Sequence, residues 1–260
     1  MKRPPEPRVA GGNLAPVVSG CDQCAHANLL AQRRCDPHDA CVQARNGRRI
    51  DRFFRAHPGA AEHYLDDVFW ERRAIAARHA PAERVEGMLH DPDEVVRRVV
   101  ASRLSPAAAG ALARDPDREV RITVAHRVEA GDLLRMVDVP DYMVRVVVAR
   151  RLPHGKLIRL VGDPDREVRK TVAGRLPAFA LMRLAADPEP EVRRVVAERA
   201  LPDDLAGFVD DPDWTVRLAA VLRAPAGLAR TCLDDDEPEV RHAAWERLRR
   251  GDSPAGGTEG

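Results

Sequence analysis

The sequence predicts an all-α protein built from stacked repeats, and two observations carry this prediction. A Val-Arg pair recurs every 24 residues without insertion or deletion, and its valines are Val96, Val120, Val144, Val168, Val192, Val216 and Val240. A second arginine keeps the same period, at Arg103, Arg127, Arg151, Arg175, Arg199, Arg223 and Arg247. Such a period indicates one structural unit stacked on copies of itself, because each unit can bury its apolar face only against its neighbours.

The composition is typical of a folded protein whose core is made of small and aliphatic side chains. Of the 260 residues, 44% are hydrophobic, 32% are charged and only 4% are aromatic, so Val, Leu and Ala must supply most of the core. The formal net charge of +1 argues against a general nucleic-acid or membrane-surface binder. No apolar run approaches the roughly 20 residues that span a bilayer, and no signal-like stretch follows the N-terminus. We therefore expect a cytoplasmic protein without a membrane segment.

Residues 1–66 are predicted to form a separate cysteine-rich domain. Four of the five cysteines fall in this region, and they are Cys21, Cys24, Cys35 and Cys41. In a reducing compartment, such a cluster favours metal binding over disulfides. Four thiolates suit either a tetrahedral zinc ion or a [4Fe–4S] cluster. The spacing matches neither ferredoxin pattern and lacks the second Cys-x₂-Cys of a zinc ribbon, so by itself it leaves both metals open. His26 and His38 lie nearby and could replace one thiolate, but a nearby His is more often a surface residue, so neither is assigned as a ligand.

Residues 67–248 are predicted to form eight repeats. Arg73 lies one period before Arg97, so residues 67–90 are interpreted as a degenerate first repeat. A first repeat needs a cover over its apolar end, and we expect the aromatic residues of the cysteine-rich domain to provide it. These are Phe53, Phe54 and Tyr64. Residues 249–260 are rich in glycine and are predicted to be a disordered tail.

Each repeat is predicted to begin with an α-helix that starts at an Asp-Pro pair. An aspartate would cap the helix, and the proline would occupy the first helical position. Val96, Val99, Val100 and Leu104 then recur at helical spacing and form an apolar face. A proline shortly after the second arginine, such as Pro153, should end the helix. The Asp-Pro pairs begin at Asp91, Asp115, Asp163, Asp187 and Asp211.

The second half of each repeat is predicted to be a short helical turn. It carries an apolar pair three residues apart, such as Leu157 and Leu160. Two ordinary helices with their connections would need about 30 residues, which exceeds the period. A 3₁₀-like turn fits the remaining length, because residues three apart lie on one side of a 3₁₀ helix. No alternating Val/Ile/Thr run is present, so we expect no sheet.

The repeat resembles the leucine-rich repeat variant, or LRV, family. The motif that carries the resemblance is Asp-Pro-x-x-x-Val-Arg-x-x-Val-Ala-x-Arg-Leu-Pro-x-x-x-Leu-x-x-Leu, from Asp163 to Leu184. The resemblance implies a right-handed superhelical solenoid in which α-helices alternate with 3₁₀ helices, without strands. A cysteine-rich iron–sulfur domain is associated with this family, and residues 21–41 resemble it. The resemblance therefore implies a [4Fe–4S] cluster on the four cysteines, with zinc as the alternative.

Some positions depart from the family motif. Val139 replaces the leading Asp of its repeat, Asp236 replaces the Pro, and Ala200 and Ala224 replace the Leu. These changes weaken single caps or contacts and leave the assignment standing. The first half of each repeat is also similar to HEAT-like repeats, but those have longer periods and rank second.

Two features outside the cysteine cluster have structural interpretations. Cys232 occupies the position of Leu184 and Phe208 in earlier repeats, so it is interpreted as a small buried hydrophobe. Arg103 follows Val96 by seven residues and lies near the helix C-terminus, where arginines cap carbonyl groups and pair with a neighbouring Asp. The alternative is a ladder of cations that follows a phosphate backbone. The scarcity of aromatic residues argues against single-stranded nucleic acid.

The sequence favours a binding function. No nucleotide-binding loop, Ser/His/Asp arrangement or paired-carboxylate motif stands out, so an enzyme is not the favoured class. We expect an iron–sulfur repeat protein that serves as a scaffold, with a protein partner on the solenoid surface and a structural or redox-sensing cluster. The alternatives are an electron-transfer or iron–sulfur enzyme component and a nucleic-acid-binding repeat protein.

Overall fold

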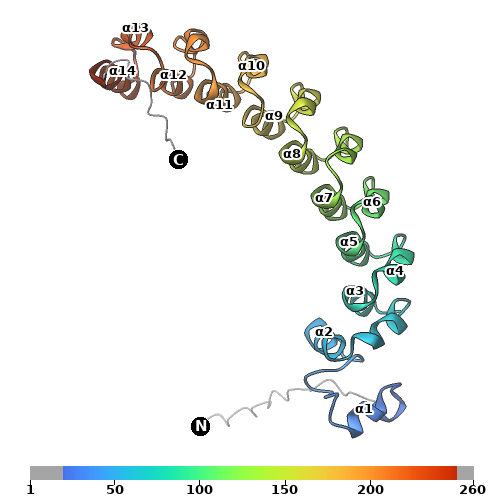
Figure 1. Ribbon diagram of the computed structural model, residues 1–260. Coiled ribbons are helices and arrows are strands. Elements are labelled where there is room, and N and C mark those ends of the chain that lie inside the picture. Colours follow the sequence, from blue (N-terminus) through green and yellow to red (C-terminus); the bar gives the residue numbers. More distant parts are fainter. Residues whose placement is uncertain (1–19, 251–260) are drawn as a thin grey trace, which may run out of the picture. The chain divides into compact units, whose positions relative to one another are not determined.

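A computed structural model describes residues 20–250, and Figure 1 shows its ribbon. Every regular element within this range is a helix, and Asp36 and Ala40 form an isolated β-bridge. The expectation of an all-α fold without sheets is therefore confirmed for the described residues. The chain divides into two compact units, the first ending at Leu104 and the second beginning at Ser105. This division falls within the repeats, whereas the limits 1–66 and 67–248 of the expected domains stay a prediction.

The first unit contains the cysteine-rich region and the first two long repeat helices. Its elements are η1 (Cys21–Gln23), α1 (Ala27–Ala31), α2 (Gly47–Ala56), η2 (Pro58–Tyr64), α3 (Trp70–His79), α4 (Ala82–Val85), η3 (Glu86–Met88) and α5 (Glu94–Arg103). The side chain of Asn46 caps α2 by accepting the N–H groups of Arg48 and Arg49. α2 packs against α3, and α3 packs against α5.

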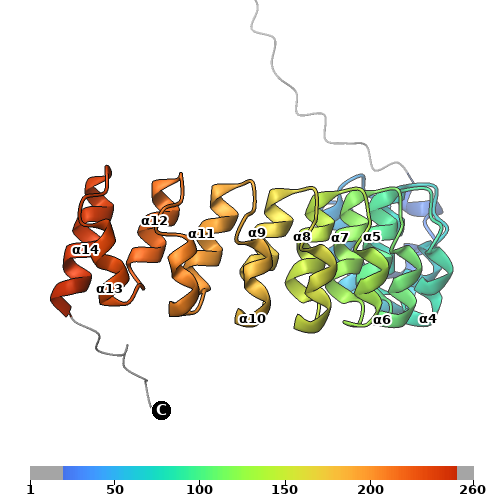
Figure 2. The same cartoon turned by 90° about the horizontal axis from the view of Figure 1, so that it is seen from above.

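The second unit repeats one pattern, a long α-helix followed by a short turn. Its elements are α6 (Pro106–Ala109), η4 (Gly110–Leu112), α7 (Arg118–Arg127), η5 (Asp132–Met136), α8 (Tyr142–Arg151), η6 (His154–Leu160), α9 (Arg166–Ala173), α10 (Ala178–Leu181), η7 (Met182–Leu184), α11 (Pro190–Arg199), η8 (Pro202–Gly207), α12 (Trp214–Val221), α13 (Ala226–Ala229), η9 (Arg230–Cys232) and α14 (Pro238–Arg250). Figure 2 shows this alternation from a second direction. The short turns are 3₁₀ helices or single α-turns that run into them, as expected. The last helix includes Arg249 and Arg250, two positions of the predicted tail, and residues 251–260 lie outside the described range.

The prediction that the Asp-Pro aspartate caps the helix is wrong. The cap is the acidic residue two positions later, as at Asp93, whose carboxylate accepts the N–H groups of Val95 and Val96. Asp91 instead accepts the N–H of Asp93 at 2.9 Å and so forms the turn before the helix. The physical reason is that the carboxylate of Asp91 is already bound by Arg73 and by the N–H of Asp93, so the next acidic residue caps the helix. Pro190 and Pro238 do occupy first helical positions, but neither belongs to an Asp-Pro pair.

The apolar faces meet in a continuous core within each unit. Val192 and Val196 of α11 are fully buried, and so are the valines of the other long helices that share their register. Leu181 and Leu184 of the short turns close the other side of this core. Cys232 is 4% exposed at the same register, which confirms its interpretation as a buried hydrophobe.

Four of the Val-Arg arginines, and Arg73 at the same register, join their repeat to the next one within the same unit. Arg169 donates from Nε and Nη2 to the two carboxylate oxygens of Asp187, eighteen residues later, at 2.7 and 2.9 Å. Its Nη1 donates to the carbonyl oxygens of Asp163 and Pro164 in its own repeat. The same two-pronged pair joins Arg73 to Asp91, Arg145 to Asp163, Arg193 to Asp211 and Arg217 to Asp235. At Asp91, Asp163, Asp187 and Asp211, the Asp of the Asp-Pro pair is therefore the partner of an arginine from the preceding repeat.

The second arginine row caps the preceding repeat, as the sequence predicts. Arg223 donates from Nη1 to the carbonyl oxygens of Ala197 and Ala200, at 3.0 and 2.7 Å, at the C-terminal end of α11. Arg103, Arg175 and Arg247 make equivalent bonds one repeat earlier in the chain. Arg103, Arg175 and Arg223 donate to carbonyl oxygens, whereas the carboxylates of Asp187 and Asp211 pair with the Val-Arg row.

The departure at Val139 has a visible consequence. Val139 is buried at the position where other repeats carry the aspartate that pairs with a Val-Arg arginine. These pairs are called the Arg–Asp ladder below, and each pair is one rung. Arg121 still donates from Nη1 to the carbonyl oxygens of Asp115 and Pro116. Its Nε, however, is buried without a hydrogen-bond partner among the described residues. One rung of the ladder is therefore missing between the repeats of α7 and α8.

Candidate metal centre

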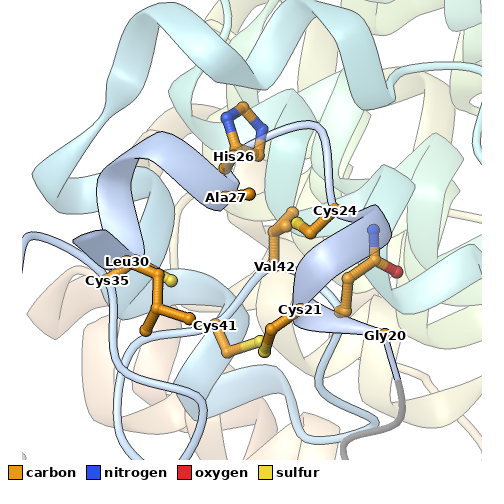
Figure 3. A pocket seen from close by; sticks show the side chains of 10 residues that line it. Gly20, Cys21, Cys24, His26, Ala27, Leu30, Cys35, Cys41 and Val42 are labelled. Atoms are coloured by element: carbon orange, nitrogen blue, oxygen red, sulfur yellow. The ribbon is translucent and has the colours of Figure 1, made fainter.

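Cys21 and Cys24 lie on one turn at the start of the described chain. Gly20 precedes the turn with φ of 109°, a left-handed conformation that glycine adopts without steric cost. The N–H of Cys24 donates to the carbonyl oxygen of Cys21 at 3.3 Å. The Cys-x₂-Cys spacing thus folds into one 3₁₀ turn and brings both thiols to the same side of the chain (Figure 3).

A tight turn brings Cys35 and Cys41 together. The backbone N–H of Ala40 donates to the carbonyl oxygen of Asp36 at 2.8 Å, and the N–H of Asp36 donates back to the carbonyl of Ala40. The two cysteines flank this turn. Cys41 also donates its backbone N–H to the carbonyl oxygen of Arg49 at 3.2 Å, which ties it to the first turn of α2.

All four predicted cysteines line one cavity, as Figure 3 shows. Its volume is about 370 Å³ when it is counted to its open mouth. The remaining lining residues are Gly20, His26, Ala27, Leu30, Val42 and Gln43. Apart from the four thiols, the wall is largely apolar, and Cys41 is the most deeply buried of the four at 4% exposure.

The electrostatics of the cavity disfavour free thiolates at Cys35 and Cys21. Burial, followed by the nearby sulfurs of Cys41, Cys24 and Cys21, raises the pKa of Cys35 to about 11. Burial and the same mutual repulsion raise the pKa of Cys21. Thiolates that repel one another in this way become stable when a bound cation neutralises them. The cysteine set is therefore suited to a cationic metal group.

The arrangement of the four cysteines can be compared with what a metal ion requires. A zinc ion with Zn–S bonds of about 2.3 Å would draw four sulfurs to within about 4 Å of one another. Within residues 20–250, no three His, Cys, Asp or Glu side chains converge closely enough to hold one metal ion. The four cysteines nevertheless surround one cavity, so together they offer four thiol ligands to one bound group.

His26 is a residue of this site that sequence reasoning placed on the surface, and that interpretation is wrong. Its ring packs on Phe53 and Tyr64, with ring centroids 4.9 and 5.8 Å apart. Its Nε2 is buried without a hydrogen-bond partner in the described chain, and burial lowers its pKa. His38, by contrast, is exposed. The signal for His26 was its position two residues after Cys24, which no periodicity could distinguish from a surface position.

The floor of the site continues into the first repeat. Phe53 and Phe54 of α2 are fully buried, and Phe54 contacts the rings of Tyr64 and His79. His79, at the end of α3, also hydrogen-bonds from Nε2 to Asp51 of α2 at 2.9 Å. Of the three aromatic residues expected to cover the first repeat, Phe54 contacts it directly, and the cover as a whole stays a prediction.

Comparisons with known proteins agree with this geometry. The family model described as "LRV protein FeS4 cluster" matches residues 17–63, and the model "Leucine rich repeat variant" matches residues 70–93 and 166–189. A solved structure entitled "A leucine-rich repeat variant with a novel repetitive protein structural motif" is 52% identical, with a TM-score of 0.83. That similarity covers 88% of this chain and 98% of the other.

A curated relative from Rhodobacter capsulatus is named "Uncharacterized 27.7 kDa protein in nifB 3'region". It is 40% identical over 89 residues, which are 34% of this chain and 36% of that protein. The chain thus matches about a third of the length of this relative. Within the described residues 20–250, no helix is both long enough and apolar enough to cross a membrane.

Proposed function

The chain belongs to the leucine-rich repeat variant family with an iron–sulfur domain, and we propose that Cys21, Cys24, Cys35 and Cys41 hold one [4Fe–4S] cluster. The observation that carries this proposal is the single cavity lined by all four cysteines. Four thiols around one cavity offer one ligand to each iron of such a cluster, and the family model named for an FeS4 cluster covers all four. When bound, such a cluster supplies one-electron redox chemistry.

This chain's own residues would bind and shield the cluster. The four thiolates supply the ligands, and the apolar wall formed by Leu30 and Val42 limits the access of water. The turn at Asp36 and the bond from Cys41 to Arg49 hold two of the ligands in place before any metal arrives. The open mouth of the cavity leaves a path for electrons to a partner.

Metal analysis of protein purified without oxygen tests the cluster. We expect about four irons per chain and a brown protein. One zinc or one iron per chain would contradict the proposal. Cys35→Ser should lower the iron content, whereas Cys232→Ser is the matched control, because Cys232 is buried in the core of the second unit. Equal loss of iron in both variants would also count against the assignment.

We propose further that the repeats act as a scaffold for a protein partner. Both arginine rows are engaged in contacts between repeats, as at Arg169 and Arg223, so these cations serve the fold. That use argues against the phosphate-ladder alternative, which needs the same side chains for a ligand. Exposed apolar side chains on the second unit, such as Tyr142 and Trp214, are the kind that protein interfaces use.

Affinity capture with the intact, cluster-loaded protein tests the scaffold role. A protein retained in a fixed ratio to the bait, and released only weakly by salt, is the expected result. Retention of nucleic acid with a steep salt dependence would favour the nucleic-acid alternative instead. Repeating the capture with oxidised and reduced protein then tests redox sensing. Equal retention in both states would leave the cluster with a structural role or one in electron transfer.

A further inference from the structure

Three apolar side chains form a ridge along α12. Trp214, Leu218 and Leu222 are spaced four residues apart, so they lie on one side of the helix and its C-cap. Trp214 is 38% exposed and Leu222 is 59% exposed. The ridge is about 12 Å long at 1.5 Å of rise per residue.

The repeats themselves provide a control for this ridge. The neighbouring long helices carry mainly charged or polar residues and proline at the same three positions. They are Arg166, Lys170 and Gly174 in the repeat of α9, Pro190, Arg194 and Glu198 in α11, and Pro238, His242 and Glu246 in α14. Packing of the solenoid therefore does not require apolar side chains there. Exposed apolar area that the fold does not need is typical of a binding surface.

Grooves run along both sides of the ridge. One lies between α11 and α12, is lined by Arg194, Glu198 and Trp214 among others, and holds about 840 Å³ counted to its open side. The other lies between α12 and α14 and holds about 770 Å³. Leu218 and Leu222 line both grooves. Figures 1 and 2 show the three helices side by side, with α12 in the middle.

The charges at the two ends of the ridge differ in sign. Arg217 near the start of α12 pairs with Asp235 just before α14, and Arg247 near the end of α14 bonds to Ala224 just after α12, so the two helices run parallel. In the first groove Arg194 and Glu198 pair with each other. Glu239 is exposed at the N-terminal end of the second groove, whereas at the opposite end Arg247 and Arg250 outnumber Glu246, which pairs with Arg250. An occupant that complements the second groove is basic over the first end and acidic over the second.

We propose that this surface, which consists of the ridge and both grooves, binds an amphipathic α-helix of a partner protein. The surface is called the α12 groove below. The proposal rests on the scaffold role above and names its surface. A helix fits because leucines spaced three and four residues apart can interdigitate with a ridge of the same spacing. Helices carry anions favourably at the N-terminus and cations at the C-terminus, so the partner helix runs antiparallel to α12. The chain's own residues 251–260 contain no Leu, Ile, Val, Phe, Met or Trp, so they lack such anchors.

A designed peptide tests the groove directly in the intact protein. The probe is a stapled, fluorescent helix of about 16 residues with leucines along one face, glutamates near its N-terminus and lysines near its C-terminus. We expect saturable binding by fluorescence anisotropy, and about tenfold weaker binding to Leu222→Glu. Phe179→Glu is the matched control, because Phe179 is an 88% exposed apolar residue on α10, outside the groove. It should bind the probe as the wild type does.

Charge exchange tests the direction of the partner helix. Glu239→Lys should weaken binding of the probe and strengthen binding of a second peptide whose charged ends are exchanged. No binding to the wild-type protein, or equal binding to Leu222→Glu and Phe179→Glu, would overturn the proposal. Self-association of the wild type in sedimentation that Leu222→Glu abolishes would overturn it too, since the occupant would be a second copy. If the Leu222→Glu variant still captures a partner protein, the groove is not its binding surface, and the scaffold role is unaffected.

Discussion

Arg169 and Asp187 form a two-pronged ion pair that links two successive repeats. The arginine Nε lies 2.7 Å from one carboxylate oxygen, and Nη2 lies 2.9 Å from the other. Both residues are buried, at 8% and 6% exposure, and the hydrogen bond to the carboxylate raises the pKa of Arg169. The same carboxylate accepts the N–H of Glu189, so one aspartate shapes the turn before α11 and holds the preceding helix.

Removing one partner of this pair should strongly destabilise the second unit. Arg169→Ala leaves the carboxylate of Asp187 buried without its cation, which costs about 3 kcal/mol of unfolding free energy. Arg166→Ala is the control, because Arg166 is half exposed and its nearest carboxylates lie 3.8 Å away or more. It should change stability by less than about 1 kcal/mol. Urea unfolding measures both, and equal effects would show that the ladder adds nothing beyond a surface pair.

The ladder should make stability fall in acid. The hydrogen bond from Arg217 lowers the pKa of Asp235 below its ordinary value of 3.8. A carboxylate with a lowered pKa stabilises the folded state fully above its unfolded pKa, and this stabilisation disappears as pH falls through the folded pKa. The stability difference between wild type and Asp235→Asn should thus be largest near neutral pH and vanish well below pH 3.8. The fluorescence of Trp214 and Trp245 reports this unfolding, and a difference that stays constant across that range would exclude the mechanism.

The second arginine row should stabilise the fold by capping. Arg175 donates to the carbonyl oxygen of Leu152 at 2.8 Å, at the end of α8. Arg175→Ala should lower the unfolding free energy by about 1–3 kcal/mol through lost packing and an unpaired carbonyl. Arg175→Lys keeps the charge and should restore part of the loss. Unchanged melting combined with weaker nucleic-acid binding would instead support the ligand-binding interpretation of this row.

The missing rung at Val139 can be restored. Val139→Asp places a carboxylate eighteen residues after Arg121, the separation found in every complete rung of the second unit. It would give the buried Nε of Arg121 a partner, and we expect a gain of about 1 kcal/mol in unfolding free energy. A double-mutant cycle with Arg121→Ala isolates the pair. Destabilisation by Val139→Asp in both backgrounds would mean that the apolar contact of Val139 outweighs the rung.

Loss of the metal should loosen the first repeats. Phe54 and Asp51 of α2 contact His79 of α3, so the cysteine region and the first repeat share one packed interface. Metal binding contributes folding free energy, because its ligands are not arranged in the unfolded chain. Hydrogen exchange should become faster in α3 and α5 after chelation, while α11 and α14 keep their protection. Identical exchange of α3 with and without metal would show that the two parts are energetically independent.

The sequence alone was sufficient to predict the repeat and its all-helical character, and it singled out the four cysteines that line one cavity. Periodicity determines the repeat and its helices, because Val192 and its counterparts must meet neighbours at the same register. Local spacing explains the cysteines, because Cys21 and Cys24 are close enough to share one turn. It also predicted that Arg223 and its row cap the preceding helix.

Tertiary structure decided the features that depend on which neighbour a side chain reaches. Asp91 looks like a helix cap in sequence, yet its carboxylate is taken by Arg73 of the preceding repeat, and the cap moves to Asp93. His26 has no period to place it, and only the packing of α2 brings Phe53 against its ring. Local spacing determines what a side chain can do along its own helix. Contacts across eighteen or more residues depend on how the chain stacks, and no single repeat contains that information.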